Sequence, residues 1–189
     1  MKKTKKYIIL LSLSLMVFTV FSCKQEHAIP KPKAQLRLEY PPPQYEKAEV
    51  EHLSFEKNKI AQIEKINPQK FNLVYPGMKA KIYLTYYPVS NNLDSLLRDA
   101  EKFTFEHTVK ADEIIRRDFV NEKDKVYGSI NLVTGNAASQ IQFHATDSTK
   151  NFINASLYFY ARPNYDSIMP AVNYIREDVQ RFMESLKWK

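Results

Sequence analysis

The chain has 189 residues, with 28 Lys and Arg against 21 Asp and Glu, which gives a formal net charge of +7. Beyond the first few residues there is no dense Lys/Arg block and no RNA-binding aromatic motif, so the charge gives little support for nucleic-acid binding. The three glycines are too far apart for a dinucleotide-binding loop, a Walker loop or a nucleophile elbow: Gly77, Gly128 and Gly135.

The first residues have the layout of a secretory signal peptide. Four of the first six are lysine: Lys2, Lys3, Lys5 and Lys6. An uncharged stretch follows over residues 7–22, and it is apolar from residue 8 to residue 21. This run is shorter than the roughly 20 apolar residues that span a bilayer. We therefore predict that residues 1–22 are a signal peptide.

The apolar run ends in Val20-Phe21-Ser22-Cys23, which resembles the lipobox of bacterial lipoproteins. The resemblance implies cleavage before Cys23 and lipidation of its sulfur, and several acyl chains give durable anchoring. Cys23 is the only cysteine, so the chain forms no internal disulfide. An uncleaved N-terminal anchor and an ordinary signal peptide stay open as alternatives. Cleavage would leave 24 basic against 21 acidic residues, a charge of about +3.

Residues 23–45 are predicted to form a lipidated, extended tether. Five of the ten prolines lie there: Pro30, Pro32, Pro41, Pro42 and Pro43. Proline fixes φ and removes an amide donor, so this stretch does not favour a helix, although residues 35–40 can pair as a strand. Residues 46–189 are enough for a single domain with a core of its own.

Alternation of apolar and polar side chains predicts several strands in this domain. The clearest are residues 80–87, 125–134, 139–146 and 151–160. Short turns at Gly135-Asn136 and Asp147-Ser148 join the last three, which indicates an antiparallel meander. We expect a further strand at residues 113–120 and an earlier hairpin from residues 59–66 and 71–75.

Two amphipathic helices are predicted. The first covers residues 93–107 with Asn92 as its N-cap, and its apolar stripe is Leu93, Leu96, Leu97, Ala100 and Phe103. The second covers residues 166–186 with Pro170 placed in its first turn, and its stripe is Ile168, Val172, Ile175, Val179, Phe182 and Leu186. We predict an α+β fold, an antiparallel β-sheet with two long helices packed on it.

The histidines give little support for a metal site, because no two lie three to five residues apart: His27, His52, His107 and His144. His107 near the end of the first helix fits a helix-dipole partner, and His144 is expected on the polar face of its strand. No metal and no cofactor is predicted.

Two hydrolase-like sets can be drawn from the sequence: Ser148 with Asp147 and His107, and Ser167 with Asp166. Serine and aspartate at turns and helix starts are more typical of caps and Asx-turns. The acidic pair Glu177-Asp178 is expected on a solvated helix face. We therefore predict no catalytic residues.

Aromatic side chains gather on the more polar faces of the predicted strands: Tyr83, Tyr87, Phe152, Tyr158 and Tyr160. We expect the helices to cover this face. An uncovered face would instead be a binding patch, and both arrangements stay open at this point.

Several segments together resemble the GldD family of gliding-motility lipoproteins. They are Pro30-Lys31-Pro32-Lys33 and Leu36-Arg37-Leu38-Glu39-Tyr40-Pro41 in the tether, and residues 105–111, 135–143, 146–150, 157–160, 163–167, 174–175, 178 and 188–189 in the domain. The order of elements is also similar to the Mog1/PsbP-like fold, which serves as a protein-binding scaffold.

The family resemblance implies an outer-membrane-associated lipoprotein that faces the periplasm and is required for gliding motility and the associated type IX secretion machinery. It implies a non-catalytic scaffold whose partners are the membrane, through the lipid anchor, and other gliding or secretion proteins. Lys24 after the cysteine also favours the outer membrane. The alternatives are a cell-envelope hydrolase, which a deep pocket with converging His or Asp groups would favour, and a glycan- or small-ligand-binding lipoprotein, which an open aromatic groove would favour.

Overall fold

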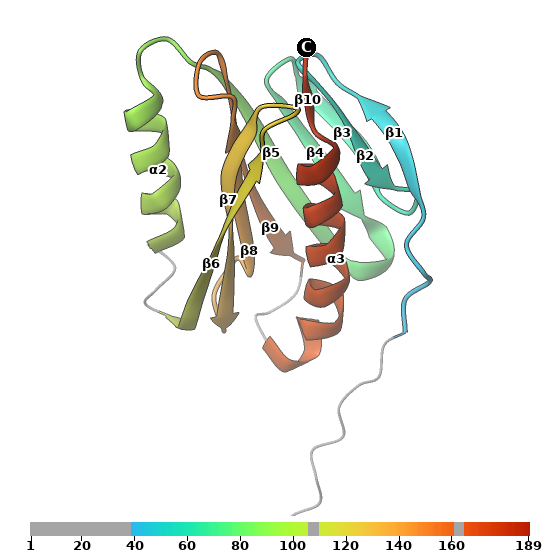
Figure 1. The fold of residues 1–189 in the computed structure, drawn as a ribbon. Helices are drawn as coiled ribbons and strands as arrows, with labels where there is room; N and C mark the ends of the chain where they lie inside the picture. The colour runs from blue at the N-terminus through green and yellow to red at the C-terminus, as the bar shows by residue number, and fades with distance from the viewer. Residues whose placement is uncertain (1–38, 106–109, 161–164) are drawn as a thin grey trace, which may run out of the picture. The chain divides into compact units, whose positions relative to one another are not determined.

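The computed structural model describes residues 39–105, 110–160 and 165–189, which form antiparallel sheets and two helices (Figure 1). This arrangement confirms the predicted α+β class. The signal peptide, Cys23, His27 and residues 35–38 of the strand considered at residues 35–40 lie outside the described residues, and Glu39 and Tyr40 are not in a strand. The Mog1/PsbP-like resemblance stays a prediction.

The larger sheet has seven strands in the order β3-β4-β5-β9-β8-β7-β6, each antiparallel to its neighbours. Their bounds are β3 (Gln62–Asn67), β4 (Lys70–Tyr75), β5 (Ala80–Pro88), β6 (Ala111–Asn121), β7 (Val126–Gly135), β8 (Ile141–Thr146) and β9 (Asn151–Phe159). A 3-10 turn, η2 (Pro76–Met78), joins β4 to β5. The predicted meander and early hairpin are confirmed, although the hairpin begins at Gln62 and not at residue 59.

A smaller sheet pairs β1 (Tyr45–Glu49), β2 (Leu53–Asn58) and β10 (Lys187–Trp188), with β2 in the centre. It brings the first and last strands of the described chain together on β2. This sheet was not predicted from the sequence. Of the five residues of β1 only Ala48 is buried, so β1 has almost no apolar alternation to detect.

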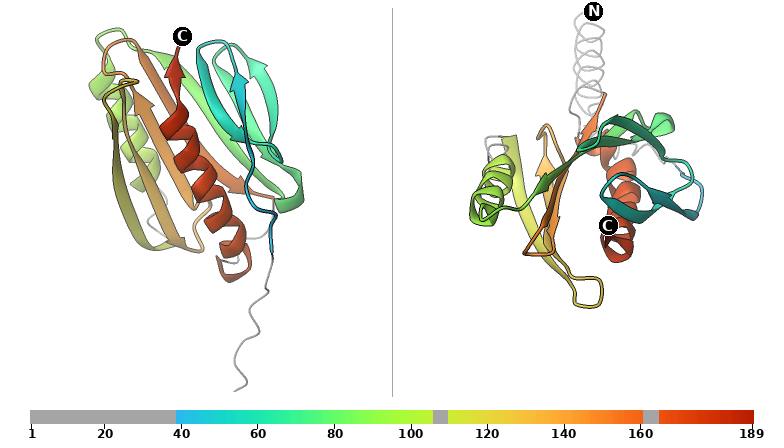
Figure 2. Two further views of the ribbon diagram at one scale, coloured as in Figure 1. Left: turned by 45° about the vertical axis from the view of Figure 1, so that its right-hand side comes forward. Right: turned by 90° about the horizontal axis from the view of Figure 1, so that it is seen from above.

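Helix α3 (Tyr165–Ser185) packs on one face of the seven-stranded sheet and is enclosed on its other side by the smaller sheet (Figure 2). All six residues of its predicted apolar stripe are buried. The ring of Phe182 lies 4.6 Å from that of Phe55 in β2 and 5.6 Å from that of Phe143 in β8. Pro170 lies inside the helix, because the helix begins at Tyr165, and the prediction of a first-turn proline is wrong.

Helix α2 (Leu93–Phe105) lies on the opposite face of the seven-stranded sheet (Figure 2). The Asn92 carbonyl accepts the first helical hydrogen bond, from the Leu96 amide, as an N-cap residue does. The helix buries only Ala100 and Thr104 fully, and Phe103 from its predicted apolar stripe is 55% exposed. The expectation that Phe103 packs on the sheet is therefore wrong, and the residues after 105 up to 109 lie outside the described part.

We expect Phe182→Ala to lower the free energy of unfolding by roughly 3–5 kcal/mol, because it opens a cavity between α3 and both sheets. Chemical denaturation of the purified protein measures this. Ile66→Ala is the control, since Ile66 is 56% exposed and its loss should cost less than about 0.5 kcal/mol. An unchanged midpoint for Phe182→Ala would contradict the packing described here.

Candidate functional site

The outer face of β5 and β9 carries an exposed group of aromatic side chains beside α2. The register sets Lys81 opposite Tyr158 and Tyr83 opposite Ser156, and residues directly opposite in an antiparallel pair share a face. Tyr83 is 40% exposed and Tyr160 is 61% exposed. We call Glu64, Lys81, Tyr83, Tyr158 and Tyr160 the tyrosine surface.

Direct contacts fix the side chains of the tyrosine surface. The hydroxyl groups of Tyr83 and Tyr160 are 3.1 Å apart, and the rings of Tyr83 and Tyr158 meet edge to face at 5.6 Å. The Lys81 ammonium nitrogen lies 5.6 Å from the Tyr83 ring centre and 5.7 Å from that of Tyr160. Lys81 also donates to Glu64 at 2.8 Å. The rings and the cation therefore form one connected network on a rigid sheet.

Hydrogen bonds shift the pKa values in this network. The bond to Glu64 is the main cause that raises the pKa of Lys81, so the ammonium group stays charged at neutral pH. The bonds from Tyr83 and then Lys81 lower the pKa of the Tyr160 hydroxyl. The pKa of Tyr83 is raised by its bond to Tyr160 and then by burial. The tyrosine rings offer apolar contacts, and their hydroxyl groups and the Lys81 ammonium group offer polar ones.

The predicted cover by helices holds for only part of this aromatic face. Phe152 is 1% exposed and stacks on His144 at 5.7 Å. Tyr83, Tyr87 and Tyr160 remain exposed, so the expectation is wrong for them. Helix α2 contacts β9, and Tyr83 and Tyr87 on the neighbouring strand β5 stay exposed.

A polar layer lies beneath α2. Thr104 donates to Gln142 at 3.0 Å and accepts from Asn131 at 3.2 Å. His144 is 5% exposed, with Nδ1 3.4 Å from the Ser129 hydroxyl. Burial, and then the nearby Arg116 charge, lowers the pKa of His144 to about 4. The expected polar strand face exists, but the helix covers it and keeps His144 neutral at pH 7.

The other candidates from the sequence that the structure describes make separate local contacts. His52 stacks on Tyr86 at 4.0 Å, and His107 lies outside the described residues. Asp147 accepts the backbone amides of residues 149–151 at 2.7–2.9 Å, as in an Asx-turn. Burial raises the pKa of Asp147, but these bonds outweigh it and lower the value to about 2. The amide of Ser148 donates to the Thr146 hydroxyl. The Asp166–Ser167 pair begins α3.

Asp178 is buried, so the prediction that it lies on a solvated face is wrong. It is 5% exposed and accepts from Tyr45 at 2.9 Å and from Asn58 at 3.1 and 3.2 Å. Burial raises the pKa of its carboxyl, although these hydrogen bonds oppose the shift. The carboxylate joins α3 to β1 and β2. Its spacing from Ile175 and Phe182 places it beside the apolar stripe, a signal that the sequence did contain.

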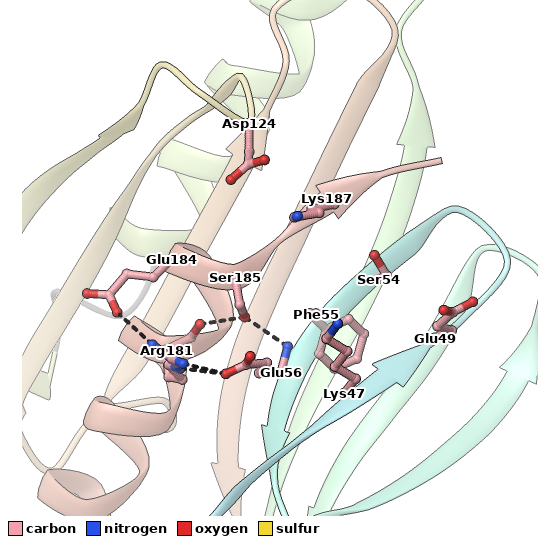
Figure 3. A pocket seen from close by; sticks show the side chains of 10 residues that line it. All are labelled: Lys47, Glu49, Ser54, Phe55, Glu56, Asp124, Arg181, Glu184, Ser185 and Lys187. Atoms are coloured by element: carbon pink, nitrogen blue, oxygen red, sulfur yellow. Dashed lines mark hydrogen bonds and ion pairs between the residues drawn. The ribbon is translucent and has the colours of Figure 1, made fainter.

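A groove of about 340 Å³ lies at the C-terminal end of α3 (Figure 3). Arg181 pairs with Glu56 at 2.6 Å across it. The Ser185 hydroxyl accepts the Glu56 amide at 2.8 Å and donates to the Arg181 carbonyl at 2.7 Å. A serine engaged in this way braces the helix against β2, because its hydroxyl proton is already donated to a backbone carbonyl. These contacts indicate a structural role for the groove.

The family model of the gliding motility lipoprotein GldD matches residues 25–188. The chain belongs to this family. A comparison with curated proteins found no match. Membership in the GldD family supports a role in gliding motility for a lipoprotein anchored in the cell envelope. In the part of the chain that the structure describes, no helix combines the length and the apolar character needed to cross a membrane.

We expect His144 to make folding pH-dependent in this GldD family member. Its folded pKa of about 4 lies below the ordinary value of 6.5, so its contribution is complete above pH 6.5 and is lost as the pH falls toward 4. The loss should reach roughly 3 kcal/mol. Urea unfolding at pH 7, 5 and 4 gives the free energy of unfolding of the wild type and of His144→Gln. The wild type should lose more of this free energy at low pH than His144→Gln does. An equal loss in both proteins would contradict a buried, neutral histidine.

Proposed function

We propose that the protein is a non-catalytic scaffold of the gliding machinery and of the associated type IX secretion machinery. Lipid on Cys23 would hold it at the outer membrane, facing the periplasm. The observation that carries the proposal is the tyrosine surface, an exposed aromatic network on rigid strands beside α2. Tyrosine is enriched at the centres of protein interfaces because it offers a large apolar ring and a hydroxyl group.

The position of this network favours tight binding to a protein. The strands β5 and β9 are inner strands of the seven-stranded sheet, paired on both sides. The rings are already held by one another and by Lys81, so little side-chain entropy is lost when a partner binds. Binding energy would come from a few aromatic anchors, with graded losses when each is removed.

The same contacts make a sugar a poorer fit than a protein. A sugar ring stacks on the face of an aromatic ring, but the Lys81 ammonium group lies over the rings of Tyr83 and Tyr160. The exposed ring edges and hydroxyl groups that remain suit protein side chains and backbone groups. A hydrolase finds no support in Ser185 or His144, because the first is a brace and the second is covered by α2.

The anchor is tested by Cys23→Ala. This change should abolish labelling by a palmitate analogue and leave soluble or uncleaved protein, because the acylated sulfur is lost. Labelling and membrane fractionation of whole cells measure both effects. A Cys23→Ala protein that still takes up the label and sediments with the envelope would contradict the anchor.

The scaffold is tested by Tyr83→Ala combined with Tyr160→Ala. We expect recovery of crosslinked partner proteins from envelopes to fall roughly tenfold or more, and gliding to weaken, while the protein stays folded. Each single change should have a smaller effect.

Ile60→Ala is the control, since Ile60 is exposed, precedes β3 and is not part of the tyrosine surface. Unchanged partner recovery in the tyrosine variant would contradict the scaffold surface. A His144→Gln protein that stays folded and keeps its partners, yet no longer supports gliding, would instead indicate an enzyme.

A further inference from the structure

Strand β6 is the last strand of the seven-stranded sheet and has a neighbour only in β7 among the described elements. It is 11 residues long. Its side chains include two of the exposed large apolar residues, Ile115 at 38% and Val120 at 63% exposure. A long edge strand with exposed apolar side chains invites pairing with another strand.

The pairing of β6 with β7 assigns each side chain to a face of the sheet. Arg117 lies opposite Ile130 of the core, which places it on the α3 face together with its alternate neighbours Ile115 and Phe119. Arg116 donates to Glu101 of α2 at 3.0 Å, which places it on the α2 face with Ile114, Asp118 and Val120. The irregularity in the β6–β7 register lies before Ile114, so the strand is regular from there onward.

This regular part is complementary to itself in the antiparallel direction. A two-fold axis through Arg117, perpendicular to the sheet, sets residues whose numbers sum to 234 opposite each other. Arg116 of each copy then lies opposite Asp118 of the other copy, so the dimer contains this pair twice. Within one copy Arg116 and Asp118 already pair at 2.9 Å, so the four charges would alternate in one network. Opposite charges directly across a ladder stabilise the pairing.

The apolar side chains match in the same register. Ile114 meets Val120 of the second copy on the α2 face, and Ile115 meets Phe119 on the α3 face. One unfavourable pair remains, Arg117 opposite itself at the axis. An axis moved by one residue to position 116 or 118 also has like charges at the axis, and in addition it sets apolar residues opposite charged ones. The match of charged with charged and apolar with apolar residues therefore favours the register centred on Arg117 over these two neighbours.

We propose that two copies of this chain pair antiparallel along β6, centred on Arg117, and form one continuous sheet. The axis is perpendicular to the sheet, so each face of one copy continues the same face of the other. Both tyrosine surfaces then lie on one side. Tyr40, the second of the described residues, packs on Tyr174 of α3 at 5.3 Å, so both described chains begin on the other side.

A cysteine scan of the full-length, membrane-anchored protein tests this. Residues opposite each other at the axis have Cα atoms about 4.5–5.5 Å apart, within the range of a disulfide. Arg117→Cys should give a disulfide-linked dimer under mild oxidation, and Ile115→Cys and Phe119→Cys should give markedly less. Wild type controls for linkage through Cys23, and Ile66→Cys on β3, at the other end of the sheet, controls for random collision. The proposal would be overturned if Ile115→Cys gave the highest yield of linked dimer, if Ile66→Cys and Arg117→Cys gave equal yields, or if Arg117→Cys gave none.

Charge exchange is the second measurement, made by analytical ultracentrifugation of the detergent-solubilised protein. Asp118→Arg sets arginine opposite arginine twice and should raise the dimer dissociation constant roughly tenfold, or about 1.4 kcal/mol. Adding Arg116→Asp restores opposite charges and should restore the dimer. Arg117→Ser should tighten it by removing the like pair at the axis. Circular dichroism checks that each variant is folded. A monomer at every concentration, or no rescue by the double exchange, would overturn the proposal.

Discussion

The enclosure of α3 between two sheets is the constraint on which the rest of the structure depends. Its buried stripe seals one face of the seven-stranded sheet, and Asp178 ties the helix to β1 and β2 through Tyr45 and Asn58. A buried carboxylate is stable only when hydrogen bonds replace its lost hydration, so this contact also fixes where the smaller sheet sits. Since α3 and the smaller sheet close that face, the exposed aromatic side chains of the tyrosine surface lie on the opposite face, which carries α2.

The other face is only partly closed because α2 is a single short helix. A packed helix spans about 10 Å, roughly the width of three strands set 4.8 Å apart, and the sheet has seven. Helix α2 therefore buries Phe152 and His144 but leaves Tyr83 and Tyr160 open. Its contact with the sheet includes a polar part, the hydrogen bonds of Thr104 with Gln142 and Asn131. The tyrosine surface is thus a consequence of how little of the sheet one helix covers.

Much of the fold could be predicted from the sequence because its strands and helices carry clear periodicity, as in β5 and α3. The β1–β2 hairpin could not, since charged residues alternate there with few apolar ones. The prediction that Asp178 is solvent-exposed fails because it treated Glu177 and Asp178 as one acidic pair. Adjacent residues on a helix point about 100° apart, so Glu177 can be exposed while Asp178 is buried. The open rings of Tyr83 and Tyr160 depend on which strands α2 covers, and no local pattern in the sequence contains that information.

The two faces of the sheet also fit the two roles of the proposed scaffold, which are attachment to the membrane and contact with a partner protein. Tyr40, near the start of the described chain, packs on the α3 side, whereas the tyrosine surface lies on the α2 side. A lipid anchor confines copies to one plane and raises their effective concentration, so a small contact along β6 can pair them where free diffusion would not. In the proposed dimer the two-fold axis is perpendicular to the sheet, so both tyrosine surfaces would face the same way. A partner that contacts both would gain avidity from contacts that are weak singly.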